Sequence, residues 1–248
     1  MPRSSRKKSR TGTYHIMLRA VNQQQIFEDN EDRQRFLQIL KDCKVISEFK
    51  LYAYCLMGNH IHLLIQEVAE PIDQIMKRIE TRFVYWYNIK YQRRGHLFQD
   101  RYKSEAVEDD SYFLSVLRYI HQNPVKAGIC KTVSDYEYSS FNEFYKKSDL
   151  IDSDQVFSLL TEKDFAEYNN EINNDKCLEA IDSFTKKVTD EQAQQIIEMY
   201  SNCKNIAEFQ KLDVKNRDKY LKIFREKGLS IRQISRLTGV GFNIARKF

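Results

Sequence analysis

Short stretches in the first 110 residues alternate between hydrophobic and polar positions or are rich in β-forming residues. Residues 14–18 alternate, and residues 51–57 and 61–65 are β-rich runs on either side of Gly58-Asn59. Alternation of period two is typical of strands, and two such runs around a short turn predict a strand–turn–strand unit. A further strand or hairpin is expected within residues 95–107.

Three other stretches have the hydrophobic spacing of helices. The first covers residues 29–47, the second opens at Pro71 and runs to about residue 90, and the third starts after the cap Asp110. We expect the third helix to stop near Asn123-Pro124, because the residue before a proline is pushed out of helical geometry. The residues expected to face the core are Phe36, Ile39, Leu40, Cys43, Ile72, Ile75, Ile79, Phe83, Phe113, Val116, Leu117 and Ile120.

The order of these elements predicts an α+β fold, a ferredoxin-like antiparallel sheet with packed helices. After about residue 148 the pattern is helical throughout. We therefore expect three parts: an α+β domain over residues 1–148, an acidic helical spacer over residues 149–200, and a basic region with a helix-turn-helix over residues 201–248.

Charge follows the same division of the chain. Residues 1–148 have a net charge of +6, residues 149–200 of −9 and residues 201–248 of +8. A charge of +8 within 48 residues favours nucleic acid as the partner of the last part. For the first part, a charged surface that only keeps the protein soluble is an equal alternative.

The composition of the chain indicates the compartment in which the protein is expected. No apolar run approaches the roughly 18 residues that cross a bilayer, and no apolar stretch follows the basic start to make a secretory signal. The 5 cysteines are scattered without a CxxC pair, which argues against a disulfide framework and a zinc ribbon. We expect a cytoplasmic protein with reduced thiols, no membrane partner, and a loose basic arm that includes Arg3, Arg6, Lys7, Lys8 and Arg10.

The stretch from Met57 to Ile65 contains the pattern His60-Ile61-His62. On a strand, residues two apart share a face, so the two imidazoles point the same way and Ile61 points the other way. Two protonated imidazoles would repel each other, whereas neutral imidazole is a common metal ligand. A metal ion between them is one interpretation. The alternative is a pair of half-exposed strand histidines without a metal.

A second candidate group lies near the end of the third predicted helix. Tyr119 and Asn123 are four residues apart, so they lie one turn from each other on one face. An amide oxygen is a hard ligand suited to magnesium or manganese. The alternative for Tyr119 is simple packing, because the chain has 15 tyrosines.

Five segments together resemble a known family, the single-tyrosine HUH transposases, and specifically the branch of REP-associated tyrosine transposases. They lie within roughly residues 12–145 in the family's order. The segments are YHIMLRAVNQQQIF, AYCLMGNHIHLLI, GHLFQDRYKSEAV, RYIHQNPVKAGI and DYEYSS. Five ordered segments are a far more specific signal than H-x-H alone.

The resemblance implies a role for each matched residue. His60 and His62 would be ligands of a divalent metal, Mg²⁺ or Mn²⁺, Asn123 would complete the metal shell, and Tyr119 would be the nucleophile. Arg101 and Lys103 match a basic strand segment and would contact DNA.

The activity implied by the resemblance is cutting and rejoining of single-stranded DNA through a covalent 5′-phosphotyrosine. The DNA partner would be a hairpin or palindromic repeat end. The resemblance also allows a homodimer, in which a tyrosine could serve its own subunit or its partner's.

The C-terminal block has a pattern of its own. Ile231, Ile234 and Leu237 share one face, and Gly239 breaks the helix before residues 242–247. This predicts a helix-turn-helix that binds DNA. An ordinary helical hairpin is the alternative. The candidate DNA contacts here are Arg232, Arg236, Arg246 and Lys247.

Two other functions stay open at this point. One is a domesticated DNA-binding protein without catalysis, although such a protein has no need of four intact site residues. The other is a metal-dependent hydrolytic nuclease in which Tyr119 only packs. Because every candidate catalytic residue precedes residue 148, we also expect truncation near that point to leave a folded core that cuts single-stranded DNA.

Overall fold

Four strands form one antiparallel sheet in the computed structural model, which describes residues 7–146, 148–173, 175, 177–178, 190–203, 205–229 and 231–247. The strands are β1 (Thr13–Arg19), β2 (Lys50–Leu56), β3 (His60–Gln66) and β4 (Lys103–Val107). Their order in the sheet is β2-β3-β1-β4. With α1 (Asn30–Ser47) between β1 and β2 and α2 (Ile72–Lys90) between β3 and β4, this is the predicted ferredoxin-like arrangement.

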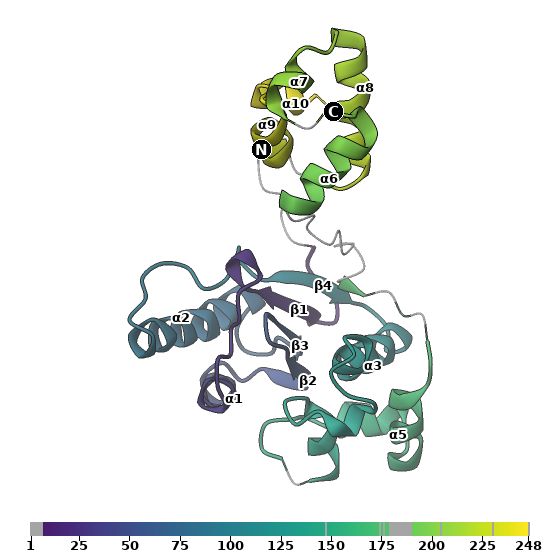
Figure 1. The fold of residues 1–248 in the computed structure, drawn as a ribbon. Coiled ribbons are helices and arrows are strands. Elements are labelled where there is room, and N and C mark those ends of the chain that lie inside the picture. The colour runs from purple at the N-terminus through teal and green to yellow at the C-terminus, as the bar shows by residue number, and fades with distance from the viewer. Residues whose placement is uncertain are drawn as a thin grey trace. The chain divides into compact units, whose positions relative to one another are not determined.

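The two faces of the sheet carry different side chains. Tyr14, Ile16 and Leu18 of β1 share the apolar face that α1 and α2 cover, whereas α3 (Asp110–Lys126) lies on the opposite face (Figure 1). The Phe113 ring of α3 lies 5.0 Å from the Tyr52 ring of β2. All twelve helix residues predicted to face the core are buried.

The helices begin at the polar residues that capping rules favour. Asp29 forms a capping box with Asp32 at the start of α1, and the Asp109 side chain accepts a hydrogen bond from the Tyr112 amide at the start of α3.

The predicted end of α3 was wrong, because the helix continues through Pro124 to Lys126. Pro124 has no backbone amide hydrogen, so only one hydrogen bond of the helix is lost, and this loss falls in the last turn. The chain still closes the helix behind it, where the Ala127 amide donates to the Asn123 carbonyl at 2.9 Å.

Residues beyond α3 continue to pack onto it. The connecting 3₁₀ turns are η2 (Val133–Asp135) and η3 (Ser140–Tyr145), and they lead to α4 (Asp154–Leu159) and α5 (Glu162–Asn170). Phe165 of α5 is fully buried, with its ring 5.9 Å from the His121 ring of α3. The first compact unit accordingly extends over residues 1–180, past the boundary expected at residue 148.

The second compact unit, residues 181–248, has its own apolar core. Its elements are α6 (Asp190–Ser201), α7 (Ile206–Gln210), α8 (Val214–Glu226), α9 (Ile231–Thr238) and α10 (Phe242–Ala245). Gly239 has a φ of +70° directly after α9, and a Cβ there would collide with Gln210 and Ile206. Because α10 has only 4 residues, the helix-turn-helix remains a prediction.

Two predictions from composition can be compared with the described residues. Within them, no helix combines the length and the apolar character that a membrane crossing requires. All five cysteines are free thiols, and four of them are buried.

Candidate functional site

Three histidines gather on the sheet face that α3 covers. His62 of β3 is in register with Met17 of β1, and His15, two residues before Met17, shares its face. The His62 ring lies 5.0 Å from the His60 ring and 5.2 Å from the His15 ring. The prediction that His60 and His62 share a face is confirmed. His62 is fully buried, so the alternative of two half-exposed histidines does not describe it.

Each of the two predicted ligands has its Nδ1 atom engaged by a neighbour. His60 Nδ1 lies 2.7 Å from Asn59 Oδ1, in the turn between β2 and β3. His62 Nδ1 lies 3.0 Å from His15 Nε2. In both rings Nε2, on the other side of the imidazole, is therefore the candidate ligand atom.

Burial keeps the imidazoles of His15 and His62 neutral. It lowers the pKa of His15 to about 3. It also lowers the pKa of His62 well below its usual value, with further lowering from the nearby positive charge of His60, His15 and Arg19. A neutral imidazole has the lone pair that a metal requires.

Tyr119 reaches this cluster from α3. Its ring lies 5.7 Å from both the His15 and His62 rings, edge-on to each, and is 7% exposed. The ammonium of Lys126 lies 5.1 Å from the centre of the same ring, and burial lowers the pKa of Lys126. The structure thus brings the predicted nucleophile and the predicted ligands together from one helix and one strand.

Asn123 follows Tyr119 by one helical turn. Its Nδ2 donates to the Tyr119 carbonyl at 3.0 Å, and the side chain is nearly buried. That bond fixes the amide and leaves its oxygen as the candidate ligand. The metal role of Asn123 stays a prediction.

The opposite face of α3 contacts residues of η3, of α5 and of the segment that follows α5. Arg118 pairs with Asp175 at 2.8 Å and with Glu171 at 2.6 Å. His121 Nδ1 lies 2.7 Å from Asn169 Oδ1, and its Nε2 lies 2.9 Å from Ser140 Oγ. Sequence reasoning missed these anchors, because nothing in the acidic stretch indicates which helix it contacts.

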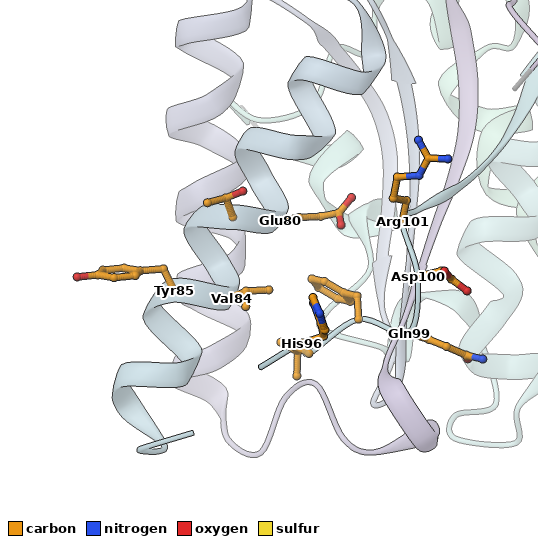
Figure 2. A pocket seen from close by; sticks show the side chains of 10 residues that line it. Glu80, Val84, Tyr85, His96, Gln99, Asp100 and Arg101 are labelled. Carbon is orange, nitrogen blue, oxygen red and sulfur yellow. The ribbon is translucent and has the colours of Figure 1, made fainter. Parts of the chain in front are cut away.

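Arg101 and Lys103, the predicted DNA contacts of the first unit, are both exposed. Lys103 of β4 is in register with Met17, and Met17 with His62, so it stands on the same row across the sheet. Arg101 lines a pocket of about 670 Å³ between α2 and residues 96–101. Figure 2 shows Glu80 of α2 on one side of this pocket and Arg101 on the other.

This pocket wall lies close to the histidines in the sheet. The Gln99 amide donates to the Arg19 carbonyl at 2.9 Å, and Arg19 is the cross-strand partner of His60.

The basic residues predicted to contact DNA in the second unit are less fully described. Arg236, Arg246 and Lys247 are exposed. The side chain of Arg232 lies outside the described residues, as do Arg3 and Arg6 of the basic arm. Their DNA contacts stay predictions.

The predicted ligands, two imidazoles and one amide oxygen, are of types that a divalent ion binds. Within the described part of the chain, no three His, Cys, Asp or Glu side chains form a group that could hold a metal. Two imidazoles and one amide oxygen would instead leave positions for phosphate and water, as a catalytic site requires.

His15 is the site residue that sequence reasoning missed. A signal for it was present: the alternation of Tyr14, Ile16 and Leu18 toward the core places His15 on the other face. Only the register of β1 against β3 shows that His62 shares that face.

Known proteins resemble the part of the chain that carries this site. The family model for IS200-like transposases matches residues 8–123. A protein of Haemophilus influenzae named "Putative REP-associated tyrosine transposase" is 33% identical over 110 residues, 40% of this chain and 62% of that protein. The REP-associated tyrosine transposase of Escherichia coli K12 is 25% identical over 96 residues, 38% of this chain and 55% of that protein. The chain thus spans less than two thirds of either relative.

A solved structure has the same fold. It is a REP-associated tyrosine transposase bound to a REP hairpin, and it aligns with a TM-score of 0.52 at 20% sequence identity. The alignment covers 61% of this chain and 94% of that chain. At this identity the likeness concerns the arrangement of the elements.

Proposed function

We propose that this chain cuts and rejoins single-stranded DNA with Tyr119 as its nucleophile, because the family model for IS200-like transposases matches residues 8–123. The observation that carries the proposal is the Tyr119 ring, placed edge-on at 5.7 Å from both His15 and His62. A tyrosine that only packed against the sheet would have no need of a neutral imidazole cluster beside it.

The reaction conserves the energy of the broken bond. The Tyr119 hydroxyl loses its proton and its oxygen bonds to phosphorus, while the bond from phosphorus to the 3′ oxygen breaks. That oxygen takes up a proton and leaves as a 3′-hydroxyl, and the 5′ end stays on the enzyme as a phosphotyrosine. Attack of a 3′-hydroxyl on the phosphotyrosine reverses the step and rejoins DNA.

His60 and His62, with Asn123, would hold a divalent ion, Mg²⁺ or Mn²⁺. When bound, such an ion would polarise the non-bridging phosphate oxygens, a contribution of several kcal/mol. Lys126 supplies a second positive charge, close to the Tyr119 ring, where a phenolate and a phosphate both carry negative charge.

The proposed substrate is a single-stranded DNA hairpin or palindromic repeat end. Support comes from the relative whose solved structure holds a REP hairpin, and from the exposed side chains of Arg101 and Lys103, of which Lys103 stands in the same cross-strand row as His62. In the second unit, Arg232, Arg236, Arg246 and Lys247 would add phosphate contacts. Each lost contact should lower the slope of log affinity against log salt by roughly 0.7.

A denaturing gel tests the proposal. The full chain is incubated with labelled hairpin DNA and Mn²⁺, and a labelled protein–DNA adduct is expected. Tyr119→Phe should abolish the adduct while binding is retained. Tyr52→Phe is the matched control, because Tyr52 is also buried and contacts α3 through Phe113.

The alternatives give different gels. Cleavage without an adduct would indicate a hydrolytic nuclease, and binding without cleavage would indicate a DNA-binding protein without catalysis. An adduct that persists in Tyr119→Phe would move the nucleophile to another residue.

A further inference from the structure

His15 lies beside both His62 and Tyr119, although none of the roles proposed above requires a histidine at this position. It is fully buried, its Nε2 lies 3.0 Å from His62 Nδ1, and its ring lies 5.7 Å from the Tyr119 ring. A buried polar side chain costs free energy unless it is hydrogen-bonded, so an apolar residue would serve the core better. Packing alone therefore does not explain why a histidine occupies this position.

The hydrogen bond between the two imidazoles can be formed in two ways. If His15 donates, His62 Nδ1 is the acceptor, and the proton of neutral His62 sits on Nε2, which then cannot bind a metal. If His62 donates from Nδ1, its Nε2 keeps the lone pair. Only the second arrangement leaves His62 competent as a ligand.

His60 shows the same arrangement with a different acceptor. Its Nδ1 lies 2.7 Å from Asn59 Oδ1, an oxygen that only accepts, so Nε2 of His60 keeps its lone pair. Asn59 for His60 and His15 for His62 are thus equivalent acceptors behind two neighbouring rings.

The same arrangement defines the tautomer of His15. For its Nε2 to accept, the proton of His15 must sit on Nδ1, which is buried and has no hydrogen-bond partner among the described residues.

We propose that His15 is a positioning residue that accepts a hydrogen bond from His62 Nδ1 and so directs Nε2 of His62 to the metal. The inference rests on the proposed function, because the ion is part of it. Groups behind a ligand in this way typically change metal affinity by about 10- to 100-fold when removed.

The test compares two substitutions in the full chain. His15→Gln offers an amide oxygen as acceptor, whereas His15→Leu fills a similar volume without one. His121→Leu is the matched control, because His121 is also fully buried and its ring nitrogens bond to Asn169 and Ser140, outside the histidine cluster. Mn²⁺ affinity is measured by calorimetry, melting temperature checks folding, and imidazole ¹⁵N shifts of the metal-free protein report the tautomer of His62.

We expect the Nδ1–H tautomer of His62, Mn²⁺ binding about 10- to 100-fold weaker in His15→Leu, and binding within a few fold of the wild type in His15→Gln. His121→Leu should melt earlier and keep its Mn²⁺ affinity. An Nε2–H tautomer in the wild type, or equal affinities in His15→Leu and wild type, would overturn the inference. Equal losses in Leu and Gln variants would also overturn it.

Failure of the proposed metal site gives a different result. Wild-type protein that binds no Mn²⁺ would remove the ion from the proposed function, and this inference with it. The tautomer measurement needs no metal, and therefore tests His15 separately.

Discussion

Both faces of α3 lie against a buried histidine or carry one, but the hydrogen-bond partners of these histidines differ. On the outer face, His121 bonds through both ring nitrogens to oxygens of Asn169 and Ser140, and Arg118 pairs with Asp175 and Glu171. On the face toward the sheet, Tyr119 meets imidazoles, and His15 bonds to His62, nitrogen to nitrogen.

This difference distinguishes residues that stabilise the position of α3 from residues that are proposed to take part in the reaction. Burial lowers the pKa of His121 to about 4 and that of His15 to about 3, so a lowered pKa alone does not distinguish them. The partners do. A histidine bonded to two oxygens has its hydrogen-bonding capacity filled, whereas histidines facing histidines retain lone pairs for a ligand. Changes on the outer face should therefore affect stability, and changes on the inner face should affect the reaction.

The largest expected effect comes from removing the outer face altogether. A chain ended after residue 148 loses Phe165, Asn169 and Asp175, and with them the ring packing and polar partners of α3. Loss of one buried Phe alone costs about 3–5 kcal/mol. We expect this fragment to lose its cooperative melting transition and its cleavage activity.

A chain ended after residue 178 is the matched comparison and should melt like the full first unit. Calorimetry of both fragments checks this. The result that we now expect is the opposite of the prediction from sequence, in which a core ending near residue 148 folds and cuts DNA. Identical melting of the two fragments would show that the outer face does not stabilise α3.

The second effect is confined to the inner face. His60→Ala should reduce cleavage at least about 100-fold, because one of the two proposed imidazole ligands is lost. EDTA should have the same effect on the wild type, and Asn123→Ala a smaller one, since water can replace an oxygen ligand. Gel assays with Mn²⁺ measure cleavage, and melting temperatures should stay within a few degrees. Full activity in EDTA would contradict the metal site.

A substitution on the outer face should give the reverse result. His121→Leu leaves Asn169 and Ser140 without their imidazole partner, which should lower the free energy of unfolding by about 2–4 kcal/mol. Cleavage per folded molecule should be unchanged at a temperature well below melting. Urea titration measures the first quantity and the gel assay the second. If the folded His121→Leu variant lost cleavage activity, the outer face would also contribute to the reaction, and the proposed distinction between the two faces would be wrong.

The smallest effect is a pH dependence that the two faces share. An unfolded chain carries histidine with a pKa near 6.5, well above the value of about 4 for His121. Between these values the unfolded state binds a proton that the folded state does not. This stability is therefore complete above pH 6.5 and is lost as pH falls toward 4, by about 2 kcal/mol between pH 7 and pH 5.

Urea titrations at both pH values, with EDTA present, measure this loss. His121→Leu has no such group and should lose about 2 kcal/mol less than the wild type over that interval. An equal loss in both proteins would mean that His121 does not titrate as its burial implies.

The sequence by itself determined the elements and most of the inner face. Alternation and helical spacing are local properties, so β1, α1, the β2–β3 pair, α2 and most of α3 followed from them. The pattern His60-Ile61-His62 placed two imidazoles on one side of a strand, and the i, i+4 spacing placed Asn123 one turn from Tyr119. Even Pro124 misled only at the last turn of α3, where one missing amide is tolerated.

Only the tertiary structure decided which of these elements meet. His15 and His62 are 47 residues apart in the chain, and their contact depends on the antiparallel register of β1 and β3. His121 and Asn169 are 48 residues apart, and nothing in the acidic stretch of the sequence indicates that part of it contacts α3. Charge and periodicity describe a segment's own surface, whereas partners are chosen by the packing of whole elements, which no local pattern contains.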